Sequence, residues 1–166
     1  MKTTAIVLAG GSGSRMNSKV KKQYLLLGEY PVLWYSLAVL EKSSRIDEII
    51  LVCGKGEQQQ CKALFVDTYG FQKIACVTEG GKERYHSVYE GLKAAGDCDY
   101  VLIHDGARPF LDEAMLSRLA DALPIWNACV VGMPVKDTIK IANPDTGCVQ
   151  ATPNSSAVPK FASVCV

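Results

Sequence analysis

The chain has 166 residues, 48% of them hydrophobic, which is enough for one globular domain with a sizeable core and excludes a disordered protein. A net charge of +1 gives no overall field toward nucleic acid or membranes, so we expect neither as a partner. Apolar runs are too short for a membrane span or a signal peptide. Seven cysteines without any Cys-x-x-Cys pair predict free thiols in a reducing cytoplasm, not a disulfide framework or a zinc site.

Short apolar runs alternate with helical patterns along the chain. This alternation predicts an α/β fold with a mostly parallel sheet that is covered on both faces. No repeat or linker interrupts it, so we expect residues 1–166 to form a single domain. We predict strands over residues 5–9, 48–53, 73–77, 100–104 and 128–133.

Four helices are predicted between these strands, over residues 58–69, 83–95 and 112–123 and from Pro31 onward. Asp112 is the expected N-cap of the last one. In the helix over residues 83–95, a stripe of large apolar side chains recurs at helical spacing, and we expect it to pack in the core. The stripe consists of Tyr85, Val88, Tyr89 and Leu92.

A glycine-rich turn follows the first predicted strand, in residues 8–16 (Leu-Ala-Gly-Gly-Ser-Gly-Ser-Arg-Met). Glycines let the backbone approach a ligand closely, and its N–H groups can cradle phosphate oxygens. Arg15 and Lys22 add positive charge, so the segment predicts a polyphosphate site. Met16 replaces the third glycine of the dinucleotide fingerprint, and no Gly-Lys-Ser/Thr follows for a P-loop. From the glycines alone, a purely structural turn remains the alternative.

Three further polar segments should open onto the same face, because ligands bind beyond the carboxyl ends of parallel strands. These are residues 80–84 with Ser87, 104–109 and 134–138. Asp105, at a strand end opposite the glycine turn, is a natural magnesium ligand, with an ion pair or a helix cap as the alternative. His104 fits a packed or hydrogen-bonded histidine better than a general base.

Taken in order, these segments resemble the 2-C-methyl-D-erythritol 4-phosphate cytidylyltransferase family of the non-mevalonate isoprenoid pathway. The resemblance covers residues 4 to about 141. It implies a Rossmann-like three-layer nucleotidyltransferase fold and a cytoplasmic protein. It also implies transfer of CMP from CTP to 2-C-methyl-D-erythritol 4-phosphate with release of pyrophosphate, a divalent cation such as Mg²⁺, and a homodimer.

The resemblance also implies a role for each matching residue. Arg15 and Lys22 would be catalytic, stabilising charge on the α-phosphate and the leaving group. Asp105 would lie near the metal and the acceptor, and Arg108 and Thr138 would help to place the acceptor. The residues expected to bind the nucleotide are Ala9, Gly10, Gly11, Gly13, Gly81 and Ser87.

The sequence departs from the family pattern at several positions. Lys21 stands where proline is usual, and Gly10 where alanine is usual, a variant also seen in ribitol-phosphate cytidylyltransferases. Ser155 replaces an arginine expected to bind the acceptor phosphate. Residues from about 142 to 166 would begin a dimerisation arm, but they diverge as in a frameshifted or truncated product, with the C-terminal part of the fold missing. The alternatives are therefore an impaired nucleotide-binding fragment or a ribitol 5-phosphate cytidylyltransferase.

Overall fold

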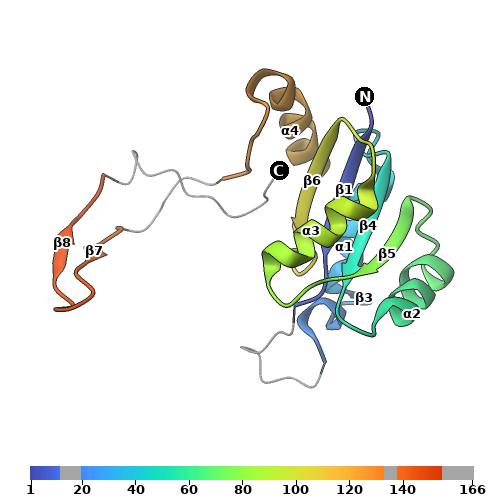
Figure 1. The fold of residues 1–166 in the computed structure, drawn as a ribbon, viewed down its shortest axis with the longest axis horizontal. Coiled ribbons are helices and arrows are strands. Elements are labelled where there is room, and N and C mark those ends of the chain that lie inside the picture. Colours follow the sequence, from blue (N-terminus) through green and yellow to red (C-terminus); the bar gives the residue numbers. More distant parts are fainter. Residues whose placement is uncertain (12–19, 133–137, 155–166) are drawn as a thin grey trace.

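A computed structural model describes residues 1–11, 20–132 and 138–154 (Figure 1). Four parallel strands form the central sheet in the order β5-β4-β1-β6. Ile6 in the middle of β1 is in register with Ile50 on one side and Ile103 on the other. The strands are β1 (Thr3–Leu8), β4 (Glu48–Cys53), β5 (Ile74–Glu79) and β6 (Tyr100–Asp105). These four strands and their parallel sheet confirm the predicted fold class.

All four predicted helices are present. They are α1 (Val32–Lys42), α2 (Gln58–Cys61) continued by the π-helix η3 (Lys62–Thr68), α3 (Arg84–Ala95) and α4 (Glu113–Trp126). Asp112 caps α4 as predicted, since its side chain accepts a hydrogen bond from the Met115 N–H at 2.7 Å. The helix continues beyond the predicted end and includes Pro124.

The sheet separates two apolar layers, because successive side chains of a strand point to opposite faces. On β1, Ala5 and Val7 belong to a cluster with α1 and α4, whereas Ile6 belongs to a second cluster beside α3. Figure 1 shows α3 in front of the strands and α1 behind them. The molecule therefore has the three layers expected, and both faces of the sheet are covered.

The predicted core stripe on α3 is wrong. Tyr85, Tyr89 and Leu92 are 67%, 60% and 42% exposed. The buried positions of this helix are instead Gly91 and Ala95. A Cβ at Gly91 would lie 2.4 Å from Cγ2 of Ile6, so only a residue without a side chain lets the helix approach the sheet this closely. These three large side chains are therefore turned away from the sheet, and only Val88, the fourth member of the predicted stripe, is half-buried. Periodicity alone pointed to the wrong face.

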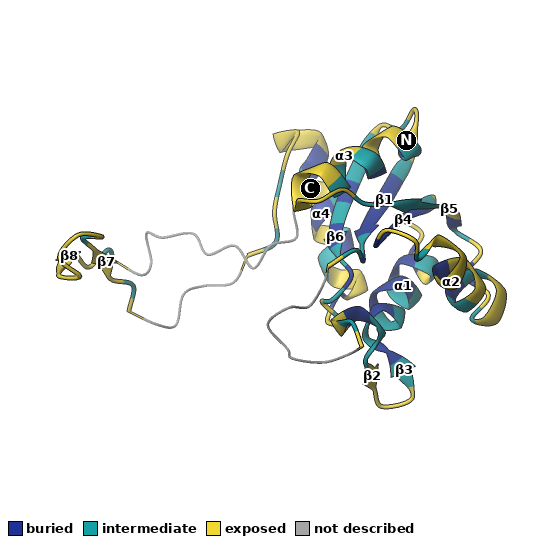
Figure 2. Ribbon diagram, turned by 60° about the horizontal axis from the view of Figure 1, so that its bottom comes forward, coloured by how far each residue is buried: buried dark blue, intermediate teal, exposed yellow. Residues whose placement is uncertain are grey.

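The predicted strand over residues 128–133 is also wrong as far as the structure describes it. Only Val130 forms an isolated bridge between residues 128 and 132. Two short hairpins complete the described chain, and the second is exposed (Figure 2). Within the described residues, no helix is long and apolar enough to cross a membrane. The hairpins are β2 (Leu26–Leu27) with β3 (Tyr30–Pro31), and β7 (Ile141–Ala142) with β8 (Val149–Ala151).

Candidate functional site

The glycine turn begins where β1 leaves the sheet. The Ala9 N–H donates to the Val52 carbonyl at 2.7 Å, which holds the start of the turn against β4. A Cβ at Gly10 would lie 3.1 Å from the Cys53 carbonyl oxygen, so the backbone of the turn runs very close to the end of β4. Gly11 is exposed, and a Cβ there would meet no atom of the described residues within 4 Å. The turn therefore presents a bare backbone at the carboxyl edge of the sheet.

A second glycine pair joins β5 to α3. The Gly80 N–H donates to the Cys53 carbonyl at 2.8 Å. A Cβ at Gly80 would lie 2.5 Å from Ser87 Oγ, and one at Gly81 would lie 2.3 Å from Cβ of His86. The first turn of α3 thus packs directly on this pair. As a result, the amino end of the helix, which carries partial positive charge, faces the glycine turn.

Asp105 ends β6 and pairs with two arginines. Arg84 Nε and Nη2 donate to its Oδ1 at 3.1 and 3.0 Å, and Arg108 Nε donates to its Oδ2 at 3.1 Å. The carboxylate side chain is 25% exposed. Of the roles kept open for Asp105, the structure shows the ion pair, and it adds Arg84 as a second partner.

These segments enclose one cleft of about 830 Å³. It collects Gly10, Gly11, Lys22, Gly81, Ser87, Asp105 and Arg108 from the predicted site residues, which are brought together from four separate parts of the chain. Ala9 is buried and does not line the cleft. Thr138 is exposed and does not line the cleft, and Gly13 and Arg15 lie outside the described residues. The remaining lining residues are Leu8, Gln23, Lys82, Glu83, Arg84 and Ala107.

Lys22 opens a single 3₁₀ turn, η2 (Lys22–Tyr24), and its exposed side chain lines the cleft. The next residue, Gln23, is buried, and its amide Nε2 donates to the carbonyls of Ala9 and of Gly11, the latter at 3.2 Å. Gln23 therefore ties the lysine turn to the glycine turn. Sequence reasoning missed this role because one amide between Lys22 and Tyr24 carries no recognisable pattern.

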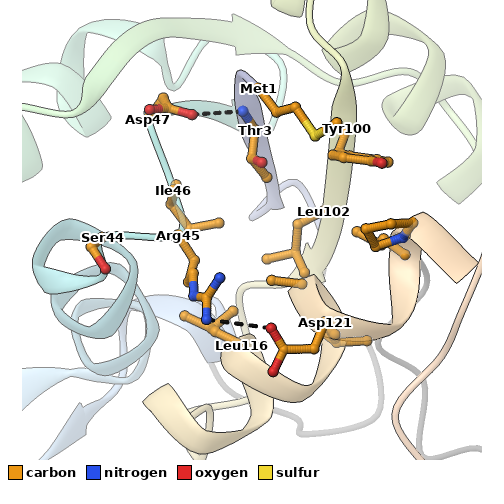
Figure 3. Close-up of a pocket in the computed structure, with 14 residues that line it drawn as sticks. Met1, Thr3, Ser44, Arg45, Ile46, Asp47, Tyr100, Leu102, Leu116 and Asp121 are labelled. Carbon is orange, nitrogen blue, oxygen red and sulfur yellow. Dashed lines mark hydrogen bonds and ion pairs between the residues drawn. The ribbon is translucent and has the colours of Figure 1, made fainter.

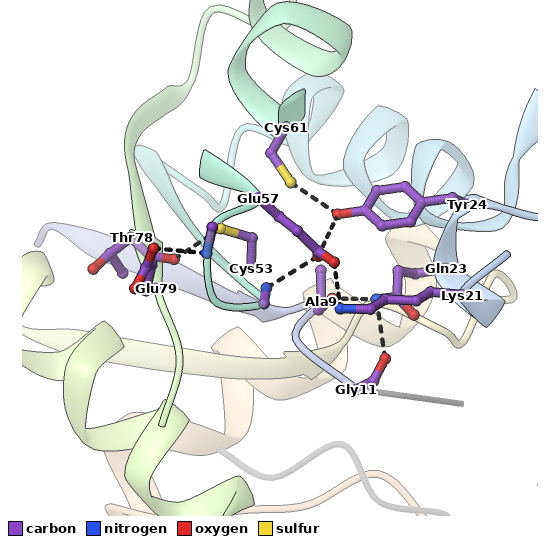
Figure 4. A network of polar contacts seen from close by, with 12 residues as sticks. Ala9, Gly11, Lys21, Gln23, Tyr24, Cys53, Glu57, Cys61, Thr78 and Glu79 are labelled. Atoms are coloured by element: carbon purple, nitrogen blue, oxygen red, sulfur yellow. Dashed lines mark hydrogen bonds and ion pairs between the residues drawn. The ribbon is translucent and has the colours of Figure 1, made fainter. Parts of the chain in front are cut away.

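A network of polar contacts lies behind the lysine turn (Figure 4). The Tyr24 hydroxyl contacts Glu57 Oε2 at 3.1 Å and Cys61 Sγ at 2.9 Å. Burial and the Cys61 thiol raise the pKa of Tyr24 far above its usual range. Hydrogen bonding between the two buried thiols lowers the pKa of Cys61 to about 7 and raises that of Cys53. Cys53, Cys61 and the four other cysteines of the described chain are free thiols, as predicted.

His104 is packed in the core, as expected from the sequence. It is 1% exposed, and its Nε2 lies 3.1 Å from the Arg108 carbonyl. Because a carbonyl can only accept, Nε2 carries the proton, and Nδ1 is left without a hydrogen-bond partner. Burial lowers the pKa of His104, which keeps the ring neutral beside the ion pairs of Asp105.

A different cavity, of about 500 Å³, lies at the amino ends of the strands (Figure 3). Its walls are mainly apolar and include Leu102 of β6 and Leu116 of α4. The ion pair between Arg45 and Asp121, with an N–O distance of 3.4 Å, lies at its edge. Within the part of the chain that the structure describes, no cluster of three His, Cys, Asp or Glu side chains could hold a metal ion at either end.

Comparison with known proteins identifies relatives that are similar to this chain over nearly its whole length. Residues 3–161 match the family model for 2-C-methyl-D-erythritol 4-phosphate cytidylyltransferase. The enzyme of that name from Lachnoclostridium phytofermentans is 46% identical over 157 residues, which is 95% of this chain and 66% of the relative. The one from Syntrophotalea carbinolica is 40% identical, over 94% of this chain and 67% of the relative. The chain thus spans about two thirds of the length of these curated relatives.

Solved structures agree with the fold. The crystal structure of 4-diphosphocytidyl-2C-methyl-D-erythritol synthase from Anaerococcus prevotii superimposes with a TM-score of 0.81 and is 33% identical in sequence. The match covers 96% of this chain and 66% of that structure. The similarity therefore includes the sheet, the helices and the loops that form the cleft.

Proposed function

Because the chain belongs to the 2-C-methyl-D-erythritol 4-phosphate cytidylyltransferase family, we propose that it transfers CMP from CTP to 2-C-methyl-D-erythritol 4-phosphate. The observation that carries the proposal is the single cleft that gathers the glycine turn, Lys22, the Gly81–Ser87 segment and Asp105. A phosphate oxygen of the acceptor attacks the α-phosphorus of CTP. The bond from that phosphorus to the oxygen shared with the β-phosphate breaks, and pyrophosphate leaves.

The cleft supports this reaction mainly through charge and position. Phosphoryl-type transfer leaves a protein little covalent work, so stabilising negative charge and aligning the reactants dominate. Gly10 and Gly11 offer close backbone approach to the triphosphate, and Lys22 supplies a cation in the same cleft. Arg15 is proposed as the second catalytic cation and Gly13 as a further loop contact. Both rest on the family resemblance, since they lie outside the described residues.

The two other edges of the cleft are assigned to the two substrates. Gly81 and Ser87 line the side beside α3, and we assign the cytidine half of CTP to them. Asp105 and Arg108 line the side beside β6 and are assigned to the acceptor. Thr138 belongs to the proposed acceptor set by resemblance, although it does not line the cleft of this structure.

A divalent cation such as Mg²⁺ fits the residues at the end of β6. Mg²⁺ is commonly held by one carboxylate together with substrate phosphates, and Asp105 supplies that carboxylate in the cleft. Its oxygens now accept from Arg84 and Arg108, so Asp105 would exchange an arginine contact for the ion. When bound, the cation would neutralise phosphate charge. The arginines that Asp105 holds would then be available to the phosphates.

We further propose one nucleotidyltransferase domain with a dimerisation arm that begins near residue 142. The exposed hairpin β7–β8 supports the arm, since it presents Ile141 and Val149 to solvent at 49% and 58% exposure. The family homodimer would bury these side chains. A cytoplasmic location is proposed from the six free thiols of the described chain.

Pyrophosphate release tests the proposed reaction. The purified chain is incubated with CTP and Mg²⁺ and with 2-C-methyl-D-erythritol 4-phosphate, ribitol 5-phosphate or no acceptor. The proposal expects release with the first acceptor only. Release with ribitol 5-phosphate alone would reassign the acceptor, and calorimetric CTP binding without any release would identify a nucleotide-binding fragment.

A further inference from the structure

The two adjacent lysines of the turn point in different directions. Lys22 is exposed and lines the cleft, whereas Lys21 is turned away from it and forms an ion pair with Glu57 (Figure 4). The Lys21 side chain is 33% exposed and that of Glu57 only 16%. Lys21 is therefore an anchor at the back of the turn, while its neighbour Lys22 faces the cleft.

Glu57 collects three donors on one carboxylate. Its Oε2 accepts from the Gly54 N–H at 3.2 Å and from the Tyr24 hydroxyl at 3.1 Å, and its Oε1 pairs with Lys21 Nζ. A partly buried carboxylate binds charged donors more strongly than an exposed one does, because solvent screens the contact less. Glu57 thus holds the residue before Lys22 and the second residue after it.

Gly54 makes room for this arrangement. A Cβ at Gly54 would lie 2.7 Å from Lys21 Nζ and 2.8 Å from Glu57 Oε2. The ion pair therefore rests directly on the backbone that follows β4, the strand to whose end the glycine turn is also bonded. Gln23 adds the connection to the carbonyls of Ala9 and Gly11.

We propose that Glu57 is a positioning residue that fixes the phosphate-binding amine of Lys22 by anchoring Lys21 and Tyr24 on either side of it. The inference rests on the proposed function in taking phosphate as the ligand of Lys22. Glu57 does not line the cleft, so it acts only through the lysine turn. No single sequence pattern connects Glu57 with the lysine turn, since Glu57 is separated from Tyr24 by 33 positions.

A double-mutant cycle tests this coupling, with inorganic tripolyphosphate and CTP as calorimetric probes. The full chain is compared with Glu57→Gln, Lys22→Ala and the double variant. We expect Glu57→Gln to weaken tripolyphosphate binding by about three- to tenfold, which is within the usual range of coupling between residues connected through a backbone shift. In the Lys22→Ala background the same change should have almost no effect, because no amine remains to be positioned.

Glu79→Gln is the matched control. Glu79 also accepts a hydrogen bond from this loop, from the Gly56 N–H at 2.8 Å, but within the described residues it is not bonded to the lysine turn. It should leave tripolyphosphate affinity unchanged. If Glu57→Gln does not fold, Tyr24→Phe replaces it in the cycle, because this change removes one Glu57 contact and keeps the ring packed against the core.

The outcomes separate the inference from the proposed function. Equal losses from Glu57→Gln with and without Lys22 would overturn the positioning role, because a merely structural effect is independent of Lys22. Absence of tripolyphosphate binding by the unmodified chain would overturn it too. A non-additive cycle with tripolyphosphate but no preference for CTP over ATP would support the positioning role and contradict the proposed function.

Discussion

The two ends of the same parallel strands form hollows of very different chemistry. At the carboxyl ends, glycine backbone, Lys22 and the ion pairs of Asp105 surround a polar cleft of about 830 Å³. At the amino ends, leucines of α4 and β6 line a cavity of about 500 Å³, with the Arg45–Asp121 pair at its edge. Both hollows are large enough for a small molecule. Only the first combines charged side chains with bare glycine backbone, so the arrangement of polar groups, not the volume, identifies the candidate site.

Among the variants that distinguish the two ends of the sheet, removal of the cleft lysine should have the largest effect on activity. We expect Lys22→Ala to lower the turnover number by about 100- to 1000-fold, since one preorganised donor to a developing charge has about that effect. Arg45→Ala removes a cation from the amino-end cavity and should leave turnover unchanged. Pyrophosphate release at saturating CTP measures both variants. A Lys22→Ala variant that raised only the Michaelis constant would contradict the assigned role.

The matched aspartates at the two ends provide the next comparison. Asp105→Asn weakens the contacts to Arg84 and Arg108, and kcat/KM should fall by about 10- to 100-fold, the equivalent of one charge-assisted hydrogen bond. Asp121→Asn should change it little, because its exposed pair with Arg45 contributes about 0–1 kcal/mol. Steady-state kinetics with both substrates would decide. Similar losses in the two variants would mean that the ends are not functionally distinct.

The cleft also depends on how closely α3 approaches the sheet. In Gly91→Ala the new Cβ would meet Ile6 Cγ2 at 2.4 Å, so we expect the free energy of unfolding to fall by about 1–2 kcal/mol after the helix-propensity gain is subtracted. Leu92→Ala on the exposed side of the helix should change it by no more than about 0.5 kcal/mol. Urea denaturation followed by circular dichroism measures both. Equal stability of the two variants would refute the close packing.

His104 predicts a smaller, pH-dependent effect beneath the cleft. Because burial lowers its pKa in the folded state, the unfolded chain takes up a proton first as the pH falls below about 6.5. Stability should therefore decrease between pH 7.5 and 5.5, by at most about 1.4 kcal/mol from this residue. Urea unfolding of His104→Gln should show a weaker pH dependence than that of the unmodified chain. If the stability of His104→Gln depended on pH as strongly as that of the unmodified chain, His104 would be excluded as the origin of the effect.

Much of the fold could be predicted because the strands are short apolar runs that alternate with helical patterns along the chain. Asp112 was identified as a cap from its residue type and position alone. The face of α3 could not be predicted in this way. Its contact with the sheet is made by Gly91 and Ala95, whose small size lets the helix approach, whereas periodicity detects large residues. The strand predicted over residues 128–133 had the right composition, but composition does not provide a neighbouring strand to pair with.

The candidate site was predictable where one segment carries several polar groups. The strand-end rule correctly placed Gly10, Gly81 and Asp105 in one cleft. It did not identify Arg84 as a partner of Asp105 or Glu57 as a partner of Lys21, because these contacts join segments that are distant in sequence. Such pairs depend on the register and packing of the strands, which residue types along the chain do not specify.

The most direct test of the central claim is a two-dimensional ¹H–¹⁵N correlation spectrum of the chain titrated with CTP and Mg²⁺. The account predicts that the largest shifts occur at backbone amides of the carboxyl-end cleft, including Gly11, Gly81 and Ser87. The amide resonances of residues around Arg45 and Asp121, at the amino ends of the strands, should not shift. Shifts concentrated at the amino-end cavity, or none at saturating CTP, would contradict it.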